Sequence, residues 1–354
     1  MERPVFDINF EDEFKIITHP ELKEARERLR SELAHLNFNC HYAIFSSGTS
    51  SKELKGYILS EKAMEANARA VNEWFSLTSE DVWGLSLPVY HVGGLSVLIR
   101  AKLLGNKVVD LRKWEPERWY QMMTDEKVTI TTIVPTQLYD LVKANLHAPH
   151  TLRYIIVGGD FLPQSLELKA RELGWPIIRT YGMTEVCSQL ASGKNPGDPL
   201  TVLPLHEVRA NSEGMLQVKS PALFTAVFTL GEKLTLTFAP DDFYTTQDKV
   251  ILKDNVINPQ GRQNQEIKIA GHLTSILTLK DTLAAVLLAE ELFGKAEIVI
   301  ESDERKGNRL VLAHNKLDEV IVEKIKTAMK PAVFDEIRSV NEFSRTDLGK
   351  LKSN

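Results

Sequence analysis

The chain has 354 residues, of which 43% are hydrophobic and 26% are charged, and its formal net charge is -5. This composition is typical of a globular protein, and this length is enough for about two or three domains and a substantial core. The small negative charge provides no electrostatic footprint for nucleic acid or for an anionic membrane, so we expect neither as a partner.

The first half of the chain alternates between predicted helices and strands. Leucine and alanine at helical spacing predict an amphipathic helix over residues 20–36, and a short apolar run predicts a buried strand at 43–45. Ser60 is suited to cap a following helix. Strands are then predicted at 82–89, 107–111, 129–134, 152–157 and 176–180, with helices at 95–104, 116–125, 136–146 and 163–173. This alternation predicts an α/β fold with a doubly wound, mainly parallel sheet, whose ligands bind beyond the carboxyl ends of the strands.

The pattern changes after residues 193–197, which are rich in turn residues. Between about residue 200 and 260, short alternating runs predict a small antiparallel β-region. The sequence Asn-Pro-Gln-Gly at 258–261 is predicted as a turn, which ends a large domain of residues 1–261. Residues 262–354 predict a small α+β domain, with strands at 266–269, 296–301, 309–314 and 336–340 and helices at 281–293 and 317–330.

Cysteine content and apolar stretches bear on location. Cys40 and Cys187 provide neither a disulfide framework nor a set of zinc ligands, which suits a reducing compartment. Residues 1–10 lack the features of a signal peptide, and the apolar stretch around 283–288 is too short to cross a bilayer. We therefore expect a cytoplasmic protein without membrane insertion.

The stretch 42–56 combines features that suit binding of a phosphate. Glycine lets the backbone approach an anion closely, successive N–H groups can form a concave anion site, and lysine neutralises charge. Tyr57 follows the last glycine where a Walker P-loop needs lysine, so that motif is disfavoured. An ordinary polar loop is the alternative. The residues that suit the anion site are Ser46, Ser47, Gly48, Thr49 and Lys55.

Tyr181-Gly182-Met183-Thr184-Glu185 follows directly after a predicted strand. A tyrosine at this position can stack on a base, a threonine can donate a hydrogen bond to a phosphate, and a glutamate is a hard oxygen ligand for Mg²⁺. The alternative is a turn that carries one solvated glutamate.

Six motifs resemble, in order, those of the acyl-adenylate-forming ligases. Tyr181 to Glu185 matches the family pattern Y-G-x-T-E and is the most specific of the six. The other five are Ser46 to Thr49 for the start of S-S-G-T-T-G-x-P-K-G, Gly158-Gly159 for a G-G pair, Thr246 to Asp248 for T-G-D, Gly261 to Gly271 for G-R-x-D-x-x-I-K-x-x-G, and Ser344 to Lys350 for P-R-T-x-x-G-K. Only about forty residues precede the first motif, where family members carry a larger region, so the resemblance implies a shortened member.

The resemblance implies a role for each matching residue. ATP would be bound by Ser46, Ser47, Gly48, Thr49, Lys55, Gly158, Gly159, Tyr181, Gly182, Asp248 and Arg262. Catalysis would rest on Lys350, Thr184, Glu185 and His91, with Glu185 as the Mg²⁺ ligand. The domain of residues 262–354 would be a mobile lid, and ATP, Mg²⁺ and coenzyme A would be required. Departures at Ser51, Gln247 and Asn264 leave a nucleotide-binding protein without turnover as an alternative.

The segment from Leu87 to Ser96, followed by Arg100, resembles P-L-x-H-x-G-G-L-S of the o-succinylbenzoate:CoA ligases of menaquinone biosynthesis, and Pro135 to Leu138 resembles their P-T-Q-L. This implies that the acid lies against His91, Gly94, Ser96 and Arg100. A buried arginine would need an anion, such as the second carboxylate of o-succinylbenzoate. It could instead reach solvent or pair with a carboxylate of the protein. Other aryl- and acyl-CoA ligases carry similar segments, so the acid stays open, as does the oligomeric state, a homodimer included.

Overall fold

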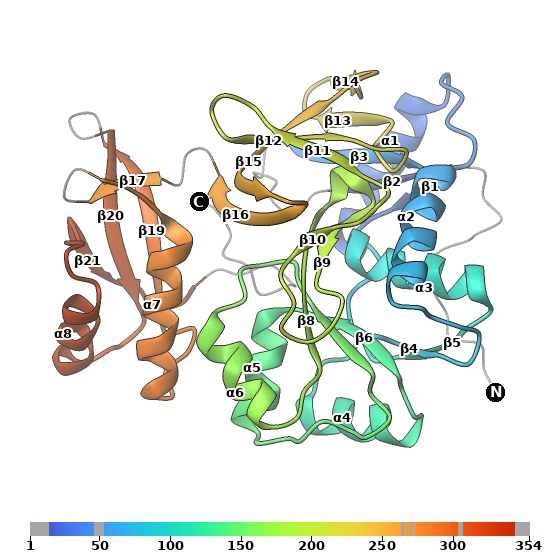
Figure 1. Cartoon of the computed structure of the whole chain (residues 1–354). Helices are drawn as coiled ribbons and strands as arrows, with labels where there is room; N and C mark the ends of the chain where they lie inside the picture. The colour runs from blue at the N-terminus through green and yellow to red at the C-terminus, as the bar shows by residue number, and fades with distance from the viewer. Residues whose placement is uncertain (1–13, 46–52, 263–265, 270–271, 304–306, 344–354) are drawn as a thin grey trace.

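The computed structural model describes residues 14–45, 53–262, 266–269, 272–303 and 307–343 (Figure 1). Within these residues the strands form four sheets, of eleven, five, three and two strands. The largest sheet contains the predicted parallel strands, and its order β11-β12-β15-β16-β10-β9-β8-β7-β6-β4-β5 places them together at one end.

Five parallel strands build this end of the large sheet. They are β4 (Val82–Leu85), β5 (Lys107–Asp110), β6 (Ile130–Ile133), β7 (Tyr154–Val157) and β8 (Ile177–Met183). The helices that accompany them are α2 (Glu61–Trp74), α3 (Val92–Leu104), α4 (Pro116–Asp125), α5 (Pro135–Lys143) and α6 (Gln164–Glu172). Figure 1 shows α2 and α3 apart from α4, α5 and α6, with the parallel strands between the two groups.

The alternation of side chains along a strand explains this layering. Ile155 packs into one core with residues of α4, α5 and α6, whereas its neighbour Ile156 packs into a second core with residues of α2 and α3. Ile177 and Ile178 divide in the same way. Because successive side chains of a strand point to opposite faces, an apolar run covered on both faces is typical of a doubly wound sheet. The predicted fold class is confirmed.

The predicted antiparallel region continues the large sheet. Its strands are β9 (Ser188–Ser192), β10 (Thr201–Val202), β11 (Glu207–Ala210), β12 (Met215–Lys219), β15 (Tyr244–Lys253) and β16 (Val256–Arg262). The turn predicted at 258–261 was wrong, because these residues lie inside β16. Lys249 pairs with Gly261 and Val250 with Pro259, so Gln260 is the extra residue of a bulge. A bulge uses the same glycine and proline signals as a turn.

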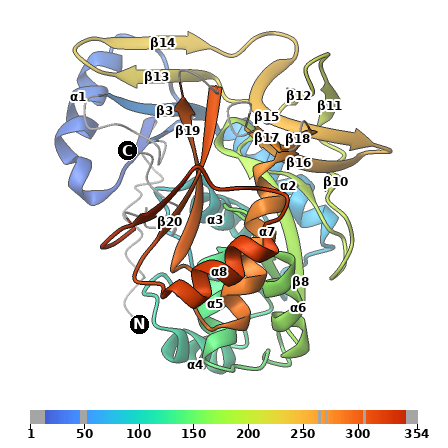
Figure 2. The same ribbon diagram turned by 90° about the vertical axis from the view of Figure 1, so that its left-hand side faces the viewer.

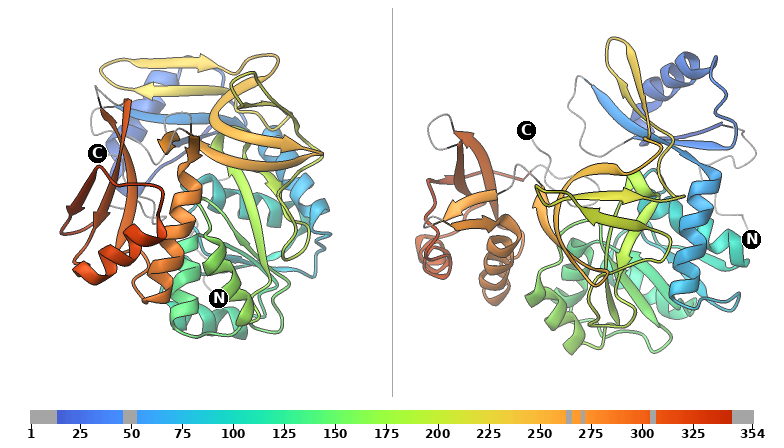
Figure 3. Two further views of the ribbon diagram at one scale, coloured as in Figure 1. Left: turned by 60° about the vertical axis from the view of Figure 1, so that its left-hand side comes forward. Right: turned by 45° about the horizontal axis from the view of Figure 1, so that its top comes forward.

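A second sheet lies beside the first and has the order β1-β2-β3-β13-β14 (Figure 3). Its strands are β1 (Phe14–Ile17), β2 (His41–Phe45), β3 (Leu54–Ser60), β13 (Ala226–Leu230) and β14 (Leu234–Phe238), and helix α1 (Lys23–Leu33) follows the 3-10 helix η1 (Pro20–Leu22). The strand predicted at 43–45 therefore exists, but it pairs antiparallel with β3, which the sequence did not predict. Gly56 makes this pairing possible, since a Cβ there would lie 2.4 Å from the carbonyl oxygen of Ile44.

The last described residues form a small α+β unit with its own apolar core (Figure 2). Its elements are β17 (Glu266–Ile269), β18 (His272–Ser275), α7 (Ile276–Ala289), β19 (Ala296–Asp303), β20 (Gly307–His314), α8 (Glu319–Ala328) and β21 (Glu336–Ser339). Helix α7 contacts α6: the backbone N–H of Gln164 donates to the Asp281 carboxylate at 2.7 Å, and Lys169 donates to the carbonyl of Leu288 at 3.1 Å. The division of the chain between residues 261 and 262, and movement of this unit, stay predictions.

The longest helices of the described ranges, α2 and α7, have 14 residues each. None of the helices in these ranges has the length and apolar character needed to cross a membrane.

His206 is a buried histidine that joins two parts of the large sheet. Its Nδ1 lies 2.8 Å from the Ser220 hydroxyl and its Nε2 lies 3.0 Å from the carbonyl of Gln189 in β9. Burial lowers the pKa of His206 to about 4, and the hydrogen bond to Gln189 offsets this effect only in part. The ring is therefore neutral near pH 7, and its Nε2–H donates to the Gln189 carbonyl.

This lowered pKa predicts a loss of stability in mild acid. Below pH 6.5 His206 is protonated in the unfolded chain, whereas in the folded chain it is protonated only below about pH 4. The free energy of unfolding therefore falls as the pH falls from 6.5 to about 4. The contribution between pH 7 and pH 5 is about 2 kcal/mol. Denaturant unfolding of the protein and of His206→Gln at both pH values should show a smaller pH dependence in the variant. Equal dependence would mean that His206 does not resist protonation.

Candidate active site

The motif at 181–185 spans the end of a strand and the turn that follows. Tyr181, Gly182 and Met183 belong to β8, which is longer than predicted, and Thr184 and Glu185 lie in the 3-10 helix η2 (Thr184–Val186). A Cβ at Gly182 would lie 1.9 Å from the carbonyl oxygen of Ser188 in β9. Only glycine permits this approach of β8 to β9. The glycine of the motif therefore has a structural role, because it allows the two strands that carry the neighbouring side chains to pack closely.

Two hydrogen bonds connect this motif with other elements. The Tyr57 hydroxyl from β3 donates to Glu185 Oε1 at 2.8 Å, and the Tyr181 hydroxyl donates to Asp248 Oδ2 of β15 at 2.6 Å. Arg262 Nε of β16 lies 3.8 Å from Asp248 Oδ1. These residues and Tyr244 form what we call the tyrosine–carboxylate cluster. Its members are Tyr57, Tyr181, Glu185, Tyr244, Asp248 and Arg262.

The electrostatics of the cluster keep its tyrosines protonated. Burial and then the Glu185 carboxylate raise the pKa of Tyr57 well above its ordinary value, and burial and then Asp248 do the same for the pKa of Tyr181. Burial and both carboxylates raise the pKa of Tyr244 to about 12. Near neutral pH the tyrosines are donors, so Glu185 and Asp248 are held in position as acceptors.

Asp248 and Arg262, both expected to bind ATP, are brought together by β-sheet pairing. They are direct partners in the register of β15 and β16. The carboxylate of Asp248 is about one quarter exposed, with 27% of its side-chain surface accessible, so it can accept hydrogen bonds from a ligand. This arrangement fits the role that the T-G-D resemblance implies, which is binding of both ribose hydroxyls.

Asp248→Ala should therefore weaken the binding of AMP by about tenfold or more, because each ribose hydroxyl would lose a hydrogen bond to a charged group. Calorimetric titration with AMP measures the change. The affinity for 2′,3′-dideoxy-AMP should not fall. Asp242→Ala is a matched control, since Asp242 is an exposed aspartate that pairs with Lys219. Unchanged AMP affinity in Asp248→Ala would contradict the assignment to the ribose.

The glycine pair Gly158-Gly159 follows β7 directly and lies next to β8. A Cβ at Gly158 would lie 2.4 Å from Cγ2 of Thr180, and Gly159 has a φ of +81°. Gly158 therefore leaves room for the Thr180 side chain, and Gly159 permits a left-handed backbone angle. Their place at the carboxyl end of β7 agrees with a role beside the nucleotide, which stays a prediction.

The residues expected to contact the acid lie at the start and along the length of α3. The strand predicted at 82–89 ends earlier, at Leu85, and His91 is the residue that precedes the first turn of α3. A Cβ at Gly94 would lie 2.2 Å from the carbonyl oxygen of Pro88, so glycine allows the chain before α3 to pack closely against it. Ser96 and Arg100 follow at helical spacing and are both buried.

Arg100 has an unusual environment. Its side chain is 1% exposed, its Nη2 lies 3.4 Å from the hydroxyl of Ser188, and its guanidinium lies 5.8 Å from the centroid of the Trp83 ring. Among the described residues it has no carboxylate partner, and its Nε has no hydrogen bond. Burial lowers the pKa of Arg100 to about 9. Neither alternative left open by the sequence, solvent or a protein carboxylate, applies within the described residues.

Ser188 connects the acid residues with the motif at 181–185. The Ser96 hydroxyl donates to the carbonyl of Gly93 at 3.0 Å, and its oxygen lies 3.3 Å from the Ser188 hydroxyl oxygen. Ser188 therefore faces both Ser96 and Arg100, three residues after Glu185. The sequence offered no motif for Ser188, and none for Tyr57 or Tyr244. A polar residue next to the 181–185 motif was the only available signal for Ser188.

For several expected site residues the structure gives a location only, or gives no description. Lys55 lies in β3 and is exposed, and Thr184 is half-buried in η2. Ser46, Ser47, Gly48, Thr49 and Lys350 lie outside the described residues, as do Ser51 and Asn264. Their assigned roles stay predictions.

Glu185 is the residue expected to hold Mg²⁺. The described residues contain no cluster of three or more histidine, cysteine, aspartate or glutamate side chains that could hold a metal by themselves. Mg²⁺ keeps several waters and is commonly bound by one or two carboxylates together with substrate phosphates. One carboxylate, fixed by Tyr57 at the end of β8, fits this mode of binding.

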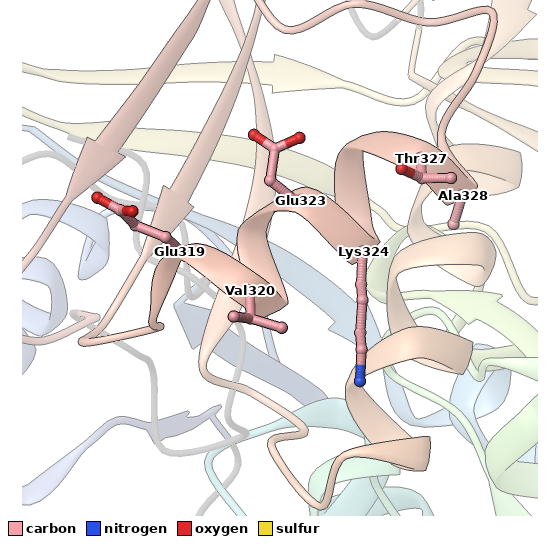
Figure 4. Close-up of a pocket in the computed structure, with 6 residues that line it drawn as sticks. All are labelled: Glu319, Val320, Glu323, Lys324, Thr327 and Ala328. Carbon is pink, nitrogen blue, oxygen red and sulfur yellow. The ribbon is translucent and has the colours of Figure 1, made fainter.

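A surface hollow of about 660 Å³ lies elsewhere, on the outer side of α8 (Figure 4). Its lining residues are Glu319, Val320, Glu323, Lys324, Thr327 and Ala328. None of them is an expected site residue, and all six belong to one helix. The hollow is therefore distinct from the candidate active site.

The sequence pattern of the family described as AMP-binding enzyme matches residues 10–211, which is more than half of the chain. The chain belongs to this family. It is 26% identical over 325 residues to the 2-succinylbenzoate--CoA ligase of Lactococcus lactis, a match that covers 87% of this chain and 69% of that protein. It is 28% identical to the enzyme of the same name from Bacillus cytotoxicus, with 75% of this chain and 57% of that protein covered.

The fold of this family member is similar to that of a solved enzyme. The structure of the Bacillus subtilis O-succinylbenzoate Coenzyme A synthetase in complex with AMP matches with a TM-score of 0.72 at 21% identity, over 88% of this chain and 67% of that one. At this identity the likeness shows the fold. The chain thus spans between just over half and about two thirds of the length of these relatives.

Proposed function

We propose that this AMP-binding family member is an ATP- and Mg²⁺-dependent carboxylate:CoA ligase that acts on o-succinylbenzoate through an acyl-adenylate. The observation that carries the choice of acid is Arg100, a buried guanidinium without a carboxylate partner among the described residues. It lies beside Ser96 and Ser188.

The energetics of Arg100 support a substrate with a second carboxylate. A buried charge is costly unless it is paired, and the lowered pKa of Arg100 reflects this cost. The planar guanidinium can bind a carboxylate with two parallel hydrogen bonds. The Ser188 hydroxyl, whose oxygen accepts from Arg100, can donate its own proton to the same carboxylate. A dicarboxylic aromatic acid would leave one carboxylate at Arg100 and present the other for activation.

The proposed reaction has two steps. The substrate carboxylate oxygen forms a bond to the α-phosphorus of ATP, and the bond to pyrophosphate breaks. The thiol sulfur of coenzyme A then forms a bond to the acyl carbon, the thiol proton is lost, and AMP leaves. Since no nucleophile of the protein takes part, Cys187, which is buried and whose thiol pKa burial raises, has no catalytic role.

The described residues have distinct parts in this scheme. Asp248 and Arg262 bind the ribose, and Tyr181 lies at the base with its hydroxyl on Asp248. Glu185 would hold Mg²⁺, which supplies positive charge to the phosphates when bound. Thr184 would donate to a phosphate, and His91, before the first turn of α3, would lie beside the reacting carboxylate.

Lys350 is assigned to the adenylation step. It would lie between the carboxylate and the α-phosphate, and the unit of residues 262–354 would reorient between the two steps. A cytoplasmic location and a homodimer are further proposals, which fractionation and light scattering would test.

Much of the same evidence also supports two other functions. Another aryl- or acyl-CoA ligase would use the same nucleotide residues, and a shortened protein could bind nucleotide without turnover. The deciding experiment measures CoA-dependent formation of AMP with o-succinylbenzoate and, separately, with benzoate. Strong activity with o-succinylbenzoate and little with benzoate is expected. Equal or greater activity with benzoate would contradict the choice of acid, and no AMP with either, together with intact AMP binding, would favour the protein without turnover.

A further inference from the structure

The turn between η2 and β9 has an unusual backbone. Cys187 has a φ of 60° and Ser188 a φ of 120°, and neither is glycine. Residues with side chains adopt such angles at a cost and keep them only where the surroundings hold them. This turn separates Glu185, in the nucleotide half of the site, from Ser188, in the acid half. Its geometry therefore sets the distance between the two halves.

Two buried side chains bind the ends of this turn from outside. The Asn67 amide of α2 donates to the carbonyl of Val186 at 3.0 Å and to that of Gln189 at 2.7 Å. The Nε2 of His206 donates to the same Gln189 carbonyl at 3.0 Å. Asn67 is fully buried, and its own Oδ1 has no hydrogen-bond partner in the described residues. A buried side-chain carbonyl without a hydrogen bond lowers the stability of the fold. The two hydrogen bonds that the Asn67 NH₂ group donates to the turn offset this cost.

We propose that Asn67 and His206 are positioning residues that hold the Val186–Gln189 turn and so fix Glu185 and Ser188 relative to each other. This inference rests on the proposed function, because it concerns the acid and nucleotide halves of that site. Neither residue touches a reacting group in the structure. Both act through the backbone of the turn.

The two residues should differ in their effects. Asn67 binds both ends of the turn, next to Glu185 and next to Ser188, so its loss should affect both halves of the site. His206 binds only the Gln189 end, so its loss should affect mainly the acid. A merely structural role would produce the same general loss of stability in each case, without this difference.

The variants are Asn67→Leu and His206→Phe, each with a control that removes a similar bond elsewhere. Asn106→Leu also removes one amide that donates to two carbonyls, those of Thr78 at 2.6 Å and Asp81 at 2.9 Å. Trp175→Phe removes a ring N–H that donates to the carbonyl of Leu146 at 2.8 Å. Both controls lie outside the site residues named above.

The first measurement needs no substrate. Hydrogen–deuterium exchange of the full chain should become faster in the peptide covering residues 185–190 in Asn67→Leu and His206→Phe, and should stay unchanged there in the two controls. Unchanged exchange in Asn67→Leu and His206→Phe would overturn the inference. Faster exchange, in a protein that activates no acid, would retain the positioning role and reject the proposed function instead.

The second measurement is steady-state kinetics with o-succinylbenzoate. His206→Phe should raise the KM for the acid by about three- to tenfold, with little change in the KM for ATP. Asn67→Leu should raise the KM for the acid and also lower kcat, with a combined loss of about tenfold or more in kcat/KM relative to Asn106→Leu. Equal losses in variants and controls would assign both residues a purely structural role.

Discussion

Replacement of Lys350 by alanine should slow the formation of acyl-adenylate from ATP by about 10²–10³-fold, because a preorganised cation in the transition state commonly contributes this much. Formation of the thioester from supplied acyl-adenylate and coenzyme A should stay largely intact, since Lys350 is assigned only to the first step. Pyrophosphate release measures the first step, and thioester formation from the supplied intermediate measures the second.

Lys352→Ala is the matched control for this prediction. It removes the same charge two residues further along the chain and should change neither step. Loss of both steps in Lys350→Ala would point to a misfolded protein or to a unit that does not reorient. Loss of neither step would remove Lys350 from the mechanism.

Replacement of Arg100 by methionine should lower kcat/KM for o-succinylbenzoate by a factor of ten or more, which corresponds to about 1.4 kcal/mol or above. Methionine keeps most of the buried volume beside Trp83 but removes the charge that the second carboxylate would pair with. Benzoate lacks that carboxylate, so whatever activity it supports should change far less. Steady-state kinetics with both acids gives the comparison.

Ser188→Ala provides the graded control. It removes the neutral hydroxyl that accepts a hydrogen bond from Arg100, and should cost less than the loss of the charge. Equal losses for both acids in Arg100→Met would mean that Arg100 is structural, and would remove the main argument for a dicarboxylic substrate. Thermal unfolding of each variant separates this outcome from a loss of folded protein.

The fold could be predicted where local pattern and packing agree. The paired isoleucines of β7 and β8 face opposite helical layers, as an apolar run in a parallel sheet requires. The prediction was wrong where glycine and proline, which are typical of turns, lie inside a strand. The sequence from Asn258 to Gly261 predicts a turn but forms a bulge in β16. Gly56 was interpreted as part of a loop, but it lies in β3, where the close pairing with β2 requires glycine.

The site could be predicted only in part, because motifs name residues but not their partners. Tyr181, Glu185 and Asp248 came from the sequence, whereas Tyr57 and Tyr244 come from strands of two different sheets and have no local signal. Arg100 was identified as unusual from the sequence. Its burial and the absence of a carboxylate partner among the described residues support a role in substrate binding, and both depend on tertiary structure. Asn67 and His206 carry no motif at all.

The contact between α6 and α7 has a consequence for movement of residues 262–354. The residue before α6 is Pro163, whose side chain cannot cap the helix, and Asp281 of α7 accepts from the free N–H of Gln164. Lys169 of α6 in turn binds a carbonyl near the end of α7. Each helix thus provides a hydrogen-bond partner for a backbone group at one end of the other helix. Rotation of the unit would expose both helix ends to water at the same time. Since both contacts involve charged side chains near the surface, dissolved salt would weaken them, and the proposed movement would then cost less free energy.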